Sequence, residues 1–179
     1  DIKVVMFNNR IYGLTKGQVS PTSELGKKTK STPFGSPDEP FNPPALALGA
    51  GATFVARSVD VEGAHMGGVL KAAADHKGSA FIEILQNCPI FNDGAYVALT
   101  EKSVKADQLL RMEQGKPLVF GKDGKKGIRL NRETIRLEVV TLGEGGVTEK
   151  DLVVHDATRE DPTYATMMAN LNQRPGFPT

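Results

Sequence analysis

The chain has 179 residues, of which 39% are hydrophobic and 24% are charged, and it contains 19 Gly and 11 Pro. This length suits one domain with a small extension, and the composition is that of a folded protein with many turns. A formal net charge of +1 provides no electrostatic field that would attract nucleic acid. No stretch approaches the roughly 18 consecutive apolar residues of a membrane span. We therefore expect no nucleic-acid partner, no membrane insertion and a cytoplasmic location.

Three short apolar runs predict the strands of a parallel sheet. Residues 2–7 (IKVVMF) form a continuous run rich in β-branched residues, which is typical of a strand buried on both faces. Similar runs recur at 53–58 and 81–86. Because the first run starts directly after Asp1, with no initiating Met, we expect the chain to be part of a longer protein.

Two helices are expected between these strands. Residues 43–51 begin with Pro and end with Gly, as helix termini favour. Residues 62–77 carry apolar side chains at helical spacing, which would form one stripe toward the sheet: Met66, Val69, Leu70 and Ala73. Strands that alternate with helices predict an α/β fold.

The pattern changes after Pro89. We expect a helix at 101–113, a hairpin whose strands at 117–120 and 127–130 flank the turn GKDGKK, a strand at 136–142, a helix around 164–171 and an irregular end over 174–179.

The long segment at 13–42 has no apolar periodicity and predicts a loop of a length that compact domains usually reserve for function. It overlaps the segment NNRIYGLTKGQVSPTS (8–23), which follows the end of a predicted strand, where ligands bind in open α/β sheets. The side-chain oxygen of Asn9 and the backbone carbonyl of Ile11 are ligands that a hard cation such as Mg²⁺ prefers.

The same segment has the residues of an anion site. Gly13 and Gly17 would let backbone amides approach an anion, Thr15 adds a hydroxyl donor and Lys16 adds a positive charge. Together they could hold a diphosphate and a substrate carboxylate. The alternative is a glycine-rich surface turn, since short glycine motifs often match by chance.

Cys88 is the only cysteine of the sequence, which excludes an intrachain disulfide. A lone thiol is more often a small buried hydrophobic group than a functional one. On its own, Cys88 is therefore interpreted as structural.

Three blocks of the sequence resemble the beta subunits of the 2-oxoacid:ferredoxin oxidoreductases. The segment 8–23 is similar to the second half of their thiamine diphosphate motif. LQNCPIFND (85–93) resembles the segment that supplies the fourth thiolate of a [4Fe-4S] cluster. GKDGKKGIRL, EVVTLGEG and DLVVHDA resemble the C-terminal part of these subunits, so the likeness covers nearly the whole chain.

The resemblance implies an α/β thiamine diphosphate-binding fold, of which residues 1–95 would be the C-terminal part, followed by an extension with a β-hairpin over 96–179. The Gly-Asp-Gly half of the cofactor motif and the other three cluster cysteines of the family are absent from this sequence.

The resemblance also assigns roles to residues. Asn9 and the backbone of Ile11 would bind Mg²⁺, Lys16 would be catalytic and face the substrate carboxylate, and Cys88 would ligate the iron-sulfur cluster. The residues that would contact thiamine diphosphate are Asn9, Ile11, Tyr12, Gly13, Leu14 and Thr15.

The implied activity is oxidative decarboxylation of a 2-oxoacid to acyl-CoA and CO₂, with electrons passing through the cluster to ferredoxin. The blocks look most like those of enzymes for 2-oxoglutarate or a broad range of 2-oxoacids, and pyruvate enzymes are close relatives. The implied partners are an alpha subunit, ferredoxin, coenzyme A and the 2-oxoacid. Two alternatives stay open: a thiamine-dependent decarboxylase or synthase without redox chemistry, and a non-catalytic fragment that needs a partner chain.

Other polar residues are interpreted as structural. They comprise three histidines without metal-ligand spacing, the lysines of one solvated loop, and three hydroxyl residues suited to turns: His65, His76, His155, Lys27, Lys28, Lys30, Ser20, Thr22 and Ser23.

Overall fold

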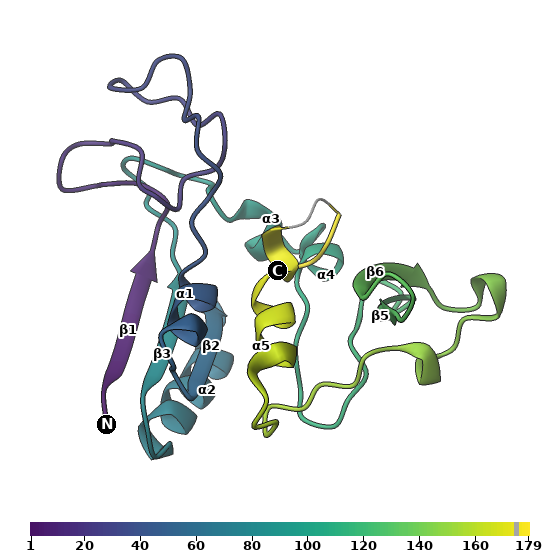
Figure 1. The fold of residues 1–179 in the computed structure, drawn as a ribbon. Helices are drawn as coiled ribbons and strands as arrows, with labels where there is room; N and C mark the ends of the chain where they lie inside the picture. The colour runs from purple at the N-terminus through teal and green to yellow at the C-terminus, as the bar shows by residue number, and fades with distance from the viewer. Residues whose placement is uncertain (174–175) are drawn as a thin grey trace. The chain divides into compact units, whose positions relative to one another are not determined.

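The structure is a computed structural model that describes residues 1–173 and 176–179. Arg174 and Pro175, at the start of the predicted irregular end, lie outside the described residues. The chain folds into two compact units, Asp1–Thr100 and Glu101–Thr179, which are described separately below (Figure 1).

The first unit contains a three-stranded parallel sheet. Its strands are β1 (Lys3–Asn8), β2 (Phe54–Val59) and β3 (Ala80–Leu85), and β3 lies between the other two. All three predicted strands are confirmed within one residue at each end. Because the strands are parallel, the loops that follow β1 and β3 leave the sheet at the same edge.

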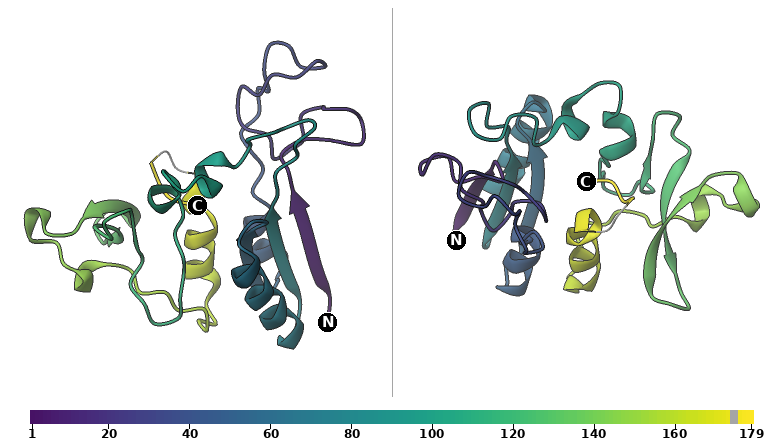
Figure 2. Two further views of the ribbon diagram at one scale, coloured as in Figure 1. Left: turned by 180° about the vertical axis from the view of Figure 1, so that it is seen from behind. Right: turned by 90° about the horizontal axis from the view of Figure 1, so that it is seen from above.

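Two helices connect these strands, α1 (Pro43–Gly49) and α2 (Gly63–Asp75). The crossover from β1 to β2 and the crossover from β2 back to β3 run in opposite directions, so right-handed connections put the helices on opposite faces. The right-hand view of Figure 2 shows this arrangement. The predicted stripe of α2 packs against the buried face of β3, where Ile82 and Ile84 lie.

Strand β1 differs from the prediction that it is buried on both faces. Val4, Val5 and Phe7 are exposed to 43%, 42% and 62%. Within the described residues β1 is an edge strand that pairs with β3 alone, and α1 and α2 pack on β2 and β3. The apolar run therefore marks a strand correctly, and within the described residues its side chains are uncovered.

The second unit contains an antiparallel sheet. Its strands are β4 (Val119–Phe120), β5 (Lys126–Asn131) and β6 (Arg136–Thr141), and helix α5 (Pro162–Ala169) follows. The predicted hairpin, strand and final helix are confirmed. Leu118, Ile128, Leu137 and Met168 form its core with neighbouring apolar residues. Short 3₁₀ helices lie at Glu144–Gly146, Glu149–Asp151 and Leu171–Gln173.

The predicted helix at 101–113 is wrong over most of its length. Only α4 (Lys105–Gln108) forms there, and the short α3 (Val97–Thr100) precedes it in the first unit. After α4 the backbone becomes extended: the Leu110 N–H donates to the Thr179 carbonyl at 2.9 Å, and the Thr179 N–H donates to the Gln108 carbonyl at 2.8 Å. Tertiary pairing and burial of Leu110 in the core replace further helical turns.

Across the part of the chain that the structure describes, none of the helices combines the length and the apolar character that crossing a membrane requires.

Candidate functional site

The predicted site residues lie in the loops that follow β1 and β3, and a buried polar network anchors these loops to the sheet. The Asn8 Nδ2 donates to Glu83 Oε1 at 2.7 Å, and Glu83 Oε2 accepts from Arg57 Nε at 2.6 Å. Both Asn8 and Glu83 are buried, so each needs these partners. The pairing joins the last residue of β1 to the central strand.

The other polar atoms of Asn8 organise the following loop. Its Oδ1 accepts from Thr22 Oγ1 at 2.7 Å and from the Arg10 N–H at 3.1 Å, and its carbonyl accepts from Tyr96 Oη at 3.0 Å. Burial raises the pKa of Tyr96 to about 12, against the opposing effect of the Arg10 guanidinium, which lies 4.7 Å from the ring centroid. Tyr96 is therefore a stable neutral donor at physiological pH.

Asn9 and Ile11 offer two oxygen atoms to a cation. Asn9 Oδ1 accepts one hydrogen bond, from the Ile11 N–H at 3.2 Å, and an amide oxygen has a second lone pair. In the described residues, the carbonyl of Ile11 accepts no hydrogen bond. The donor set fits a hard cation such as Mg²⁺. Among those residues no cluster of three or more His, Cys, Asp or Glu side chains forms a further metal site.

The segment after Ile11 folds back on itself as a closed turn. The Tyr12 N–H donates to the Gln18 carbonyl at 2.9 Å, and the Gly17 N–H donates to the Tyr12 carbonyl at 3.0 Å. The Lys16 N–H donates to the Gly13 carbonyl at 3.0 Å. Lys16 and Gly17 both have left-handed backbones, with φ of 68° and 98°. We call residues 12–18 the cofactor loop.

Three consecutive amides of the cofactor loop are available to a ligand. In the described structure the N–H groups of Gly13, Leu14 and Thr15 donate no hydrogen bond within the chain. The Thr15 hydroxyl donates to the Tyr12 carbonyl at 3.3 Å. Adjacent unpaired amides are the donors that protein loops use to bind phosphate groups. The predicted anion site is therefore chemically consistent with this turn.

Several side chains of the cofactor loop point to solvent. Tyr12, Leu14, Thr15 and Lys16 are exposed, and Leu14 is 99% exposed. The structure thus presents the predicted residues on one accessible loop at the carboxyl edge of the sheet. An ammonium group at Lys16 can reach an anionic ligand without being buried.

Cys88 lies in the turn that follows β3, beside the cofactor loop. Its thiol is free and partly buried, and its carbonyl accepts from the Asn92 N–H at 2.9 Å. We call residues 88–92 the cysteine turn. Asn92 Nδ2 donates to the Asn9 carbonyl at 2.9 Å, so the cysteine turn is bonded to the predicted cation ligand. The sequence placed these two segments far apart, and the fold brings them together.

An aromatic contact reinforces this link. A methyl group placed on Gly17 would lie 3.2 Å from Phe91 Cδ1, and one placed on Gly13 would lie 3.7 Å from Phe91 Cδ2. The ring of Phe91 therefore lies directly against the cofactor loop. At Gly17 both this close contact and the positive φ favour glycine.

Lys27 was predicted to be solvated, and this prediction is wrong. Its ammonium group donates to Asn92 Oδ1 at 2.5 Å and pairs with Glu24 at 3.0 Å. Burial alone would raise the pKa of Glu24, but the hydrogen bonds from its own backbone and from Lys27 hold it below the usual value. Lys28 and Lys30 are exposed, as expected.

The hydroxyl side chains of the loop form hydrogen bonds that stabilise its turns, as predicted. The Ser20 N–H donates to Ser23 Oγ at 2.9 Å, and Ser23 Oγ donates to the Arg10 carbonyl at 2.6 Å. With Thr22 on Asn8, they fold residues 10–23 back onto the end of β1.

The three histidines have neighbouring hydroxyl partners. The pairs are His65 with Ser58 at 2.9 Å, His76 with Thr53 at 2.7 Å, and His155 with Tyr164 at 2.9 Å. These contacts give each ring a structural role.

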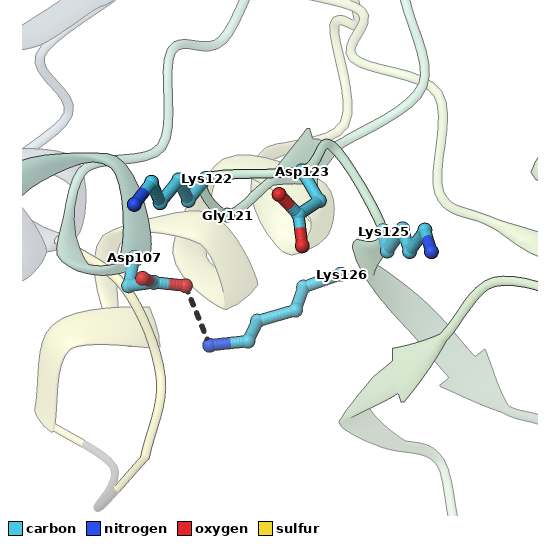
Figure 3. A pocket seen from close by; sticks show the side chains of 6 residues that line it. All are labelled: Asp107, Gly121, Lys122, Asp123, Lys125 and Lys126. Atoms are coloured by element: carbon cyan, nitrogen blue, oxygen red, sulfur yellow. Dashed lines mark hydrogen bonds and ion pairs between the residues drawn. The ribbon is translucent and has the colours of Figure 1, made fainter.

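A shallow hollow of about 200 Å³ lies in the second unit, at the turn between β4 and β5. Figure 3 shows that Lys126 turns toward Asp107, to which it is ion-paired at 2.7 Å, while Lys125 points away. Lys122 and Asp123 complete the charged lining. Because charges of both signs are present and do not converge, this hollow is a weaker candidate than the cofactor loop.

Comparison with known proteins shows what the first unit is similar to. Residues 1–84 match the model "Thiamine pyrophosphate enzyme, C-terminal TPP binding domain". The chain is 47% identical over 174 residues to "2-oxoglutarate oxidoreductase subunit KorB" of Mycobacterium tuberculosis, which covers 97% of this chain and 45% of that protein. It is 50% identical over 93 residues to "2-oxoacid:ferredoxin oxidoreductase subunit beta" of Saccharolobus solfataricus, covering 52% and 30%.

Over these spans the chain is similar to the beta subunits of the 2-oxoacid:ferredoxin oxidoreductases. A solved structure, "2-oxoglutarate:ferredoxin oxidoreductase from Magnetococcus marinus with 2-oxoglutarate, coenzyme A and succinyl-CoA bound", aligns with this chain at a TM-score of 0.50 and 40% identity, covering 51% of this chain and 32% of that chain. The predicted α/β thiamine diphosphate-binding fold is thereby confirmed. The segment spans less than half the length of the curated relatives it matches.

Proposed function

We propose that this chain forms part of the thiamine diphosphate site and supplies one thiolate to a [4Fe-4S] cluster in a 2-oxoacid:ferredoxin oxidoreductase. The reaction converts a 2-oxoacid, coenzyme A and two oxidised ferredoxins into acyl-CoA, CO₂, one proton and two reduced ferredoxins. The observation that carries the proposal is the hydrogen bond from Asn92 to the Asn9 carbonyl, which holds the turn of Cys88 beside the cofactor loop.

The chain's own groups suit the cofactor's diphosphate and its cation. The unpaired amides of Gly13, Leu14 and Thr15 would donate to phosphate oxygens, while Asn9 Oδ1 and the Ile11 carbonyl would bind Mg²⁺. Phosphate oxygens, water or other residues would complete the magnesium shell. When bound, thiamine diphosphate supplies a carbanion for attack on the 2-oxo carbon and an electron sink for the electrons left by CO₂.

We assign substrate orientation to Lys16. Its exposed ammonium group can pair with the carboxylate of a 2-oxoacid and hold it beside the cofactor loop. The substrate we propose is 2-oxoglutarate, because relatives from four organisms carry 2-oxoglutarate in their names. Pyruvate is the competing substrate to test.

We assign cluster ligation to Cys88. A [4Fe-4S] cluster takes four thiolates, and this sequence has one cysteine, so three must come from elsewhere. An alpha subunit, ferredoxin and coenzyme A are the partners that this activity requires, and we place it in the reducing cytoplasm.

The two alternatives predict different roles for these residues. A thiamine enzyme without redox chemistry would use Asn9 but not Cys88, and the names of the relatives do not favour it. A non-catalytic fragment would bind neither cofactor without a partner chain. The first alternative is an outcome of the following experiment.

The test compares Cys88→Ser with the unchanged protein in the complete enzyme, prepared without oxygen as the full-length beta subunit with its alpha subunit. We expect Cys88→Ser to keep thiamine diphosphate binding and to lose ferredoxin reduction and the paramagnetic signal of the reduced cluster. Ile90→Ser is the matched control, because Ile90 lies in the same turn and is exposed, and it should retain both. Ferredoxin reduction at the normal rate in Cys88→Ser would reject the cluster assignment.

A further inference from the structure

We infer that Asn92 is a positioning residue. It sets the place of the proposed cation ligands, Asn9 and Ile11, and of the adjoining cofactor loop relative to Cys88. The inference rests on the proposed function, because it concerns the same cofactor and cluster. It adds a residue to which the sequence pattern assigned no role. Its basis is a set of contacts that the fold creates between two loops.

Asn92 is 4% exposed, and both ends of its side-chain amide are bonded. The ammonium group of Lys27 can only donate, so the amide oxygen must face Lys27, at 2.5 Å. The amide nitrogen must then face the Asn9 carbonyl, which can only accept, at 2.9 Å. Lys27 thus fixes which way the amide points, and Asn92 in turn holds the Asn9 peptide.

The backbone of Asn92 provides the hydrogen bond to the Cys88 segment. Its N–H closes the cysteine turn on the Cys88 carbonyl at 2.9 Å. One buried residue is therefore bonded both to the peptide of Asn9 and to the peptide of Cys88. Movement of either segment would break a hydrogen bond made by a residue that is itself buried.

Phe91 provides an independent contact between the same two segments. Its ring lies against Gly13 and Gly17, on the cofactor loop. An apolar contact on one side and an oriented amide on the other restrict both sliding and rotation of the loop. Phe91 and Asn92, which follow Cys88, therefore hold the cofactor loop in place.

Loss of the amide donor should change both cofactor sites. The Asn9 carbonyl would lose its partner, and the side chain of Asn9 and the neighbouring Ile11 carbonyl would move with that peptide. Residues that orient metal ligands in this way typically contribute about 10- to 100-fold to metal affinity. The cysteine turn would relax at the same time, which would alter the surroundings of the Cys88 sulfur.

The test uses Asn92→Asp in the complete enzyme. Aspartate keeps the size of the side chain and an oxygen toward Lys27, but it cannot donate to the Asn9 carbonyl. We expect Mg²⁺-dependent thiamine diphosphate binding, measured by calorimetry, to weaken about 10- to 100-fold. We also expect the paramagnetic spectrum of the reduced cluster to shift. Asp93→Asn is the matched control, because it is a reverse exchange in the adjacent exposed residue, and it should change neither.

The outcomes separate this inference from the function on which it rests. If the unchanged enzyme binds neither cofactor, the proposed function fails. If the unchanged enzyme binds both and Asn92→Asp behaves identically, the positioning role is overturned. Should Asn92→Asp fail to fold, Lys27→Met carries the test, since it leaves the amide in place without its orienting partner. Unchanged binding and an unchanged cluster spectrum in Lys27→Met would then overturn the inference.

Discussion

Asn8 Nδ2 donates a buried hydrogen bond of 2.7 Å to Glu83 Oε1, which joins the end of β1 to the central strand β3. Glu83 is a carboxylate in the middle of an otherwise apolar strand, AFIEIL, and its other oxygen pairs with Arg57. The two loops of the candidate site begin directly after the strands that this network connects.

Replacing Glu83 should destabilise the first unit. Glu83→Ala would leave Asn8 and Arg57 without their partner, and breaking a buried ion pair costs about 3–5 kcal/mol. Because Arg57 is partly exposed, we expect the free energy of unfolding to fall by about 3 kcal/mol, as measured by urea unfolding of the whole chain. Glu83→Gln, which can still accept from Asn8, should lose less. Equal losses in the two variants would mean that the hydrogen bond to Asn8 contributes little.

Asn9 should be needed for its oxygen atom. Asn9→Ala removes the proposed magnesium ligand and also the acceptor of the Ile11 N–H, so Mg²⁺-dependent thiamine diphosphate binding should be lost. Asn9→Asp retains an oxygen at the same place and should retain binding. Calorimetric titration of the complete enzyme with thiamine diphosphate, with and without Mg²⁺, measures both. Normal binding in Asn9→Ala would exclude Asn9 as a ligand.

Gly17→Ala should be more destabilising than the same change at another left-handed glycine. Gly17 has φ of 98° and lies against Phe91, while Gly94 has φ of 78° and open space around it. The left-handed backbone alone costs about 1–2 kcal/mol for a residue with a Cβ, so Gly94→Ala reports that cost. The excess at Gly17 should disappear in a Phe91→Ala background. Urea unfolding of Gly17→Ala, Gly94→Ala, Phe91→Ala and the Gly17→Ala/Phe91→Ala double variant measures these costs. An excess that persists without the Phe91 ring would show that the cost does not arise from the contact with Phe91.

His155 should make the second unit less stable in acid. Burial lowers its pKa in the folded chain below the ordinary 6.5, against the opposing charge of Asp156. The unfolded chain therefore binds a proton more readily, and stability falls as the pH drops below about 6.5. The free energy of unfolding at pH about 7.5 and about 5.5 measures this loss. His155→Gln should show a smaller difference, and an equal difference would assign the acid sensitivity to other groups.

Much of the fold could be predicted because local patterns match local structure. The apolar runs at 53–58 and 81–86 became β2 and β3, and the stripe of Met66, Val69, Leu70 and Ala73 packs on the sheet as helical spacing requires. The glycine-rich turn GKDGKK lies between β4 and β5. These elements depend on side-chain periodicity and turn residues, which are present in the sequence itself.

Other features depend on neighbours that are distant in the chain. The helix predicted over 101–113 stops at Gln108 because the C-terminus pairs with its last turn. Within the described residues β1 lies at the edge of the sheet, and no local pattern encodes its pairing with β3. From the sequence, Lys27 is expected to be a solvated loop cation. The fold brings it into hydrogen-bonding contact with Asn92, which is 65 residues away in the chain.

The sequence by itself determined the chemistry of the candidate site, since the amide of Asn9, the glycines of the cofactor loop and the thiol of Cys88 are chemical types that can be read in one dimension. Only the tertiary structure decided that these groups share one edge of a sheet, and that Glu83 and Asn92 hold them there. The reason is physical: a hydrogen bond of about 3 Å requires its two groups to meet in space, and parallel strand pairing sets where the loops after β1 and β3 meet.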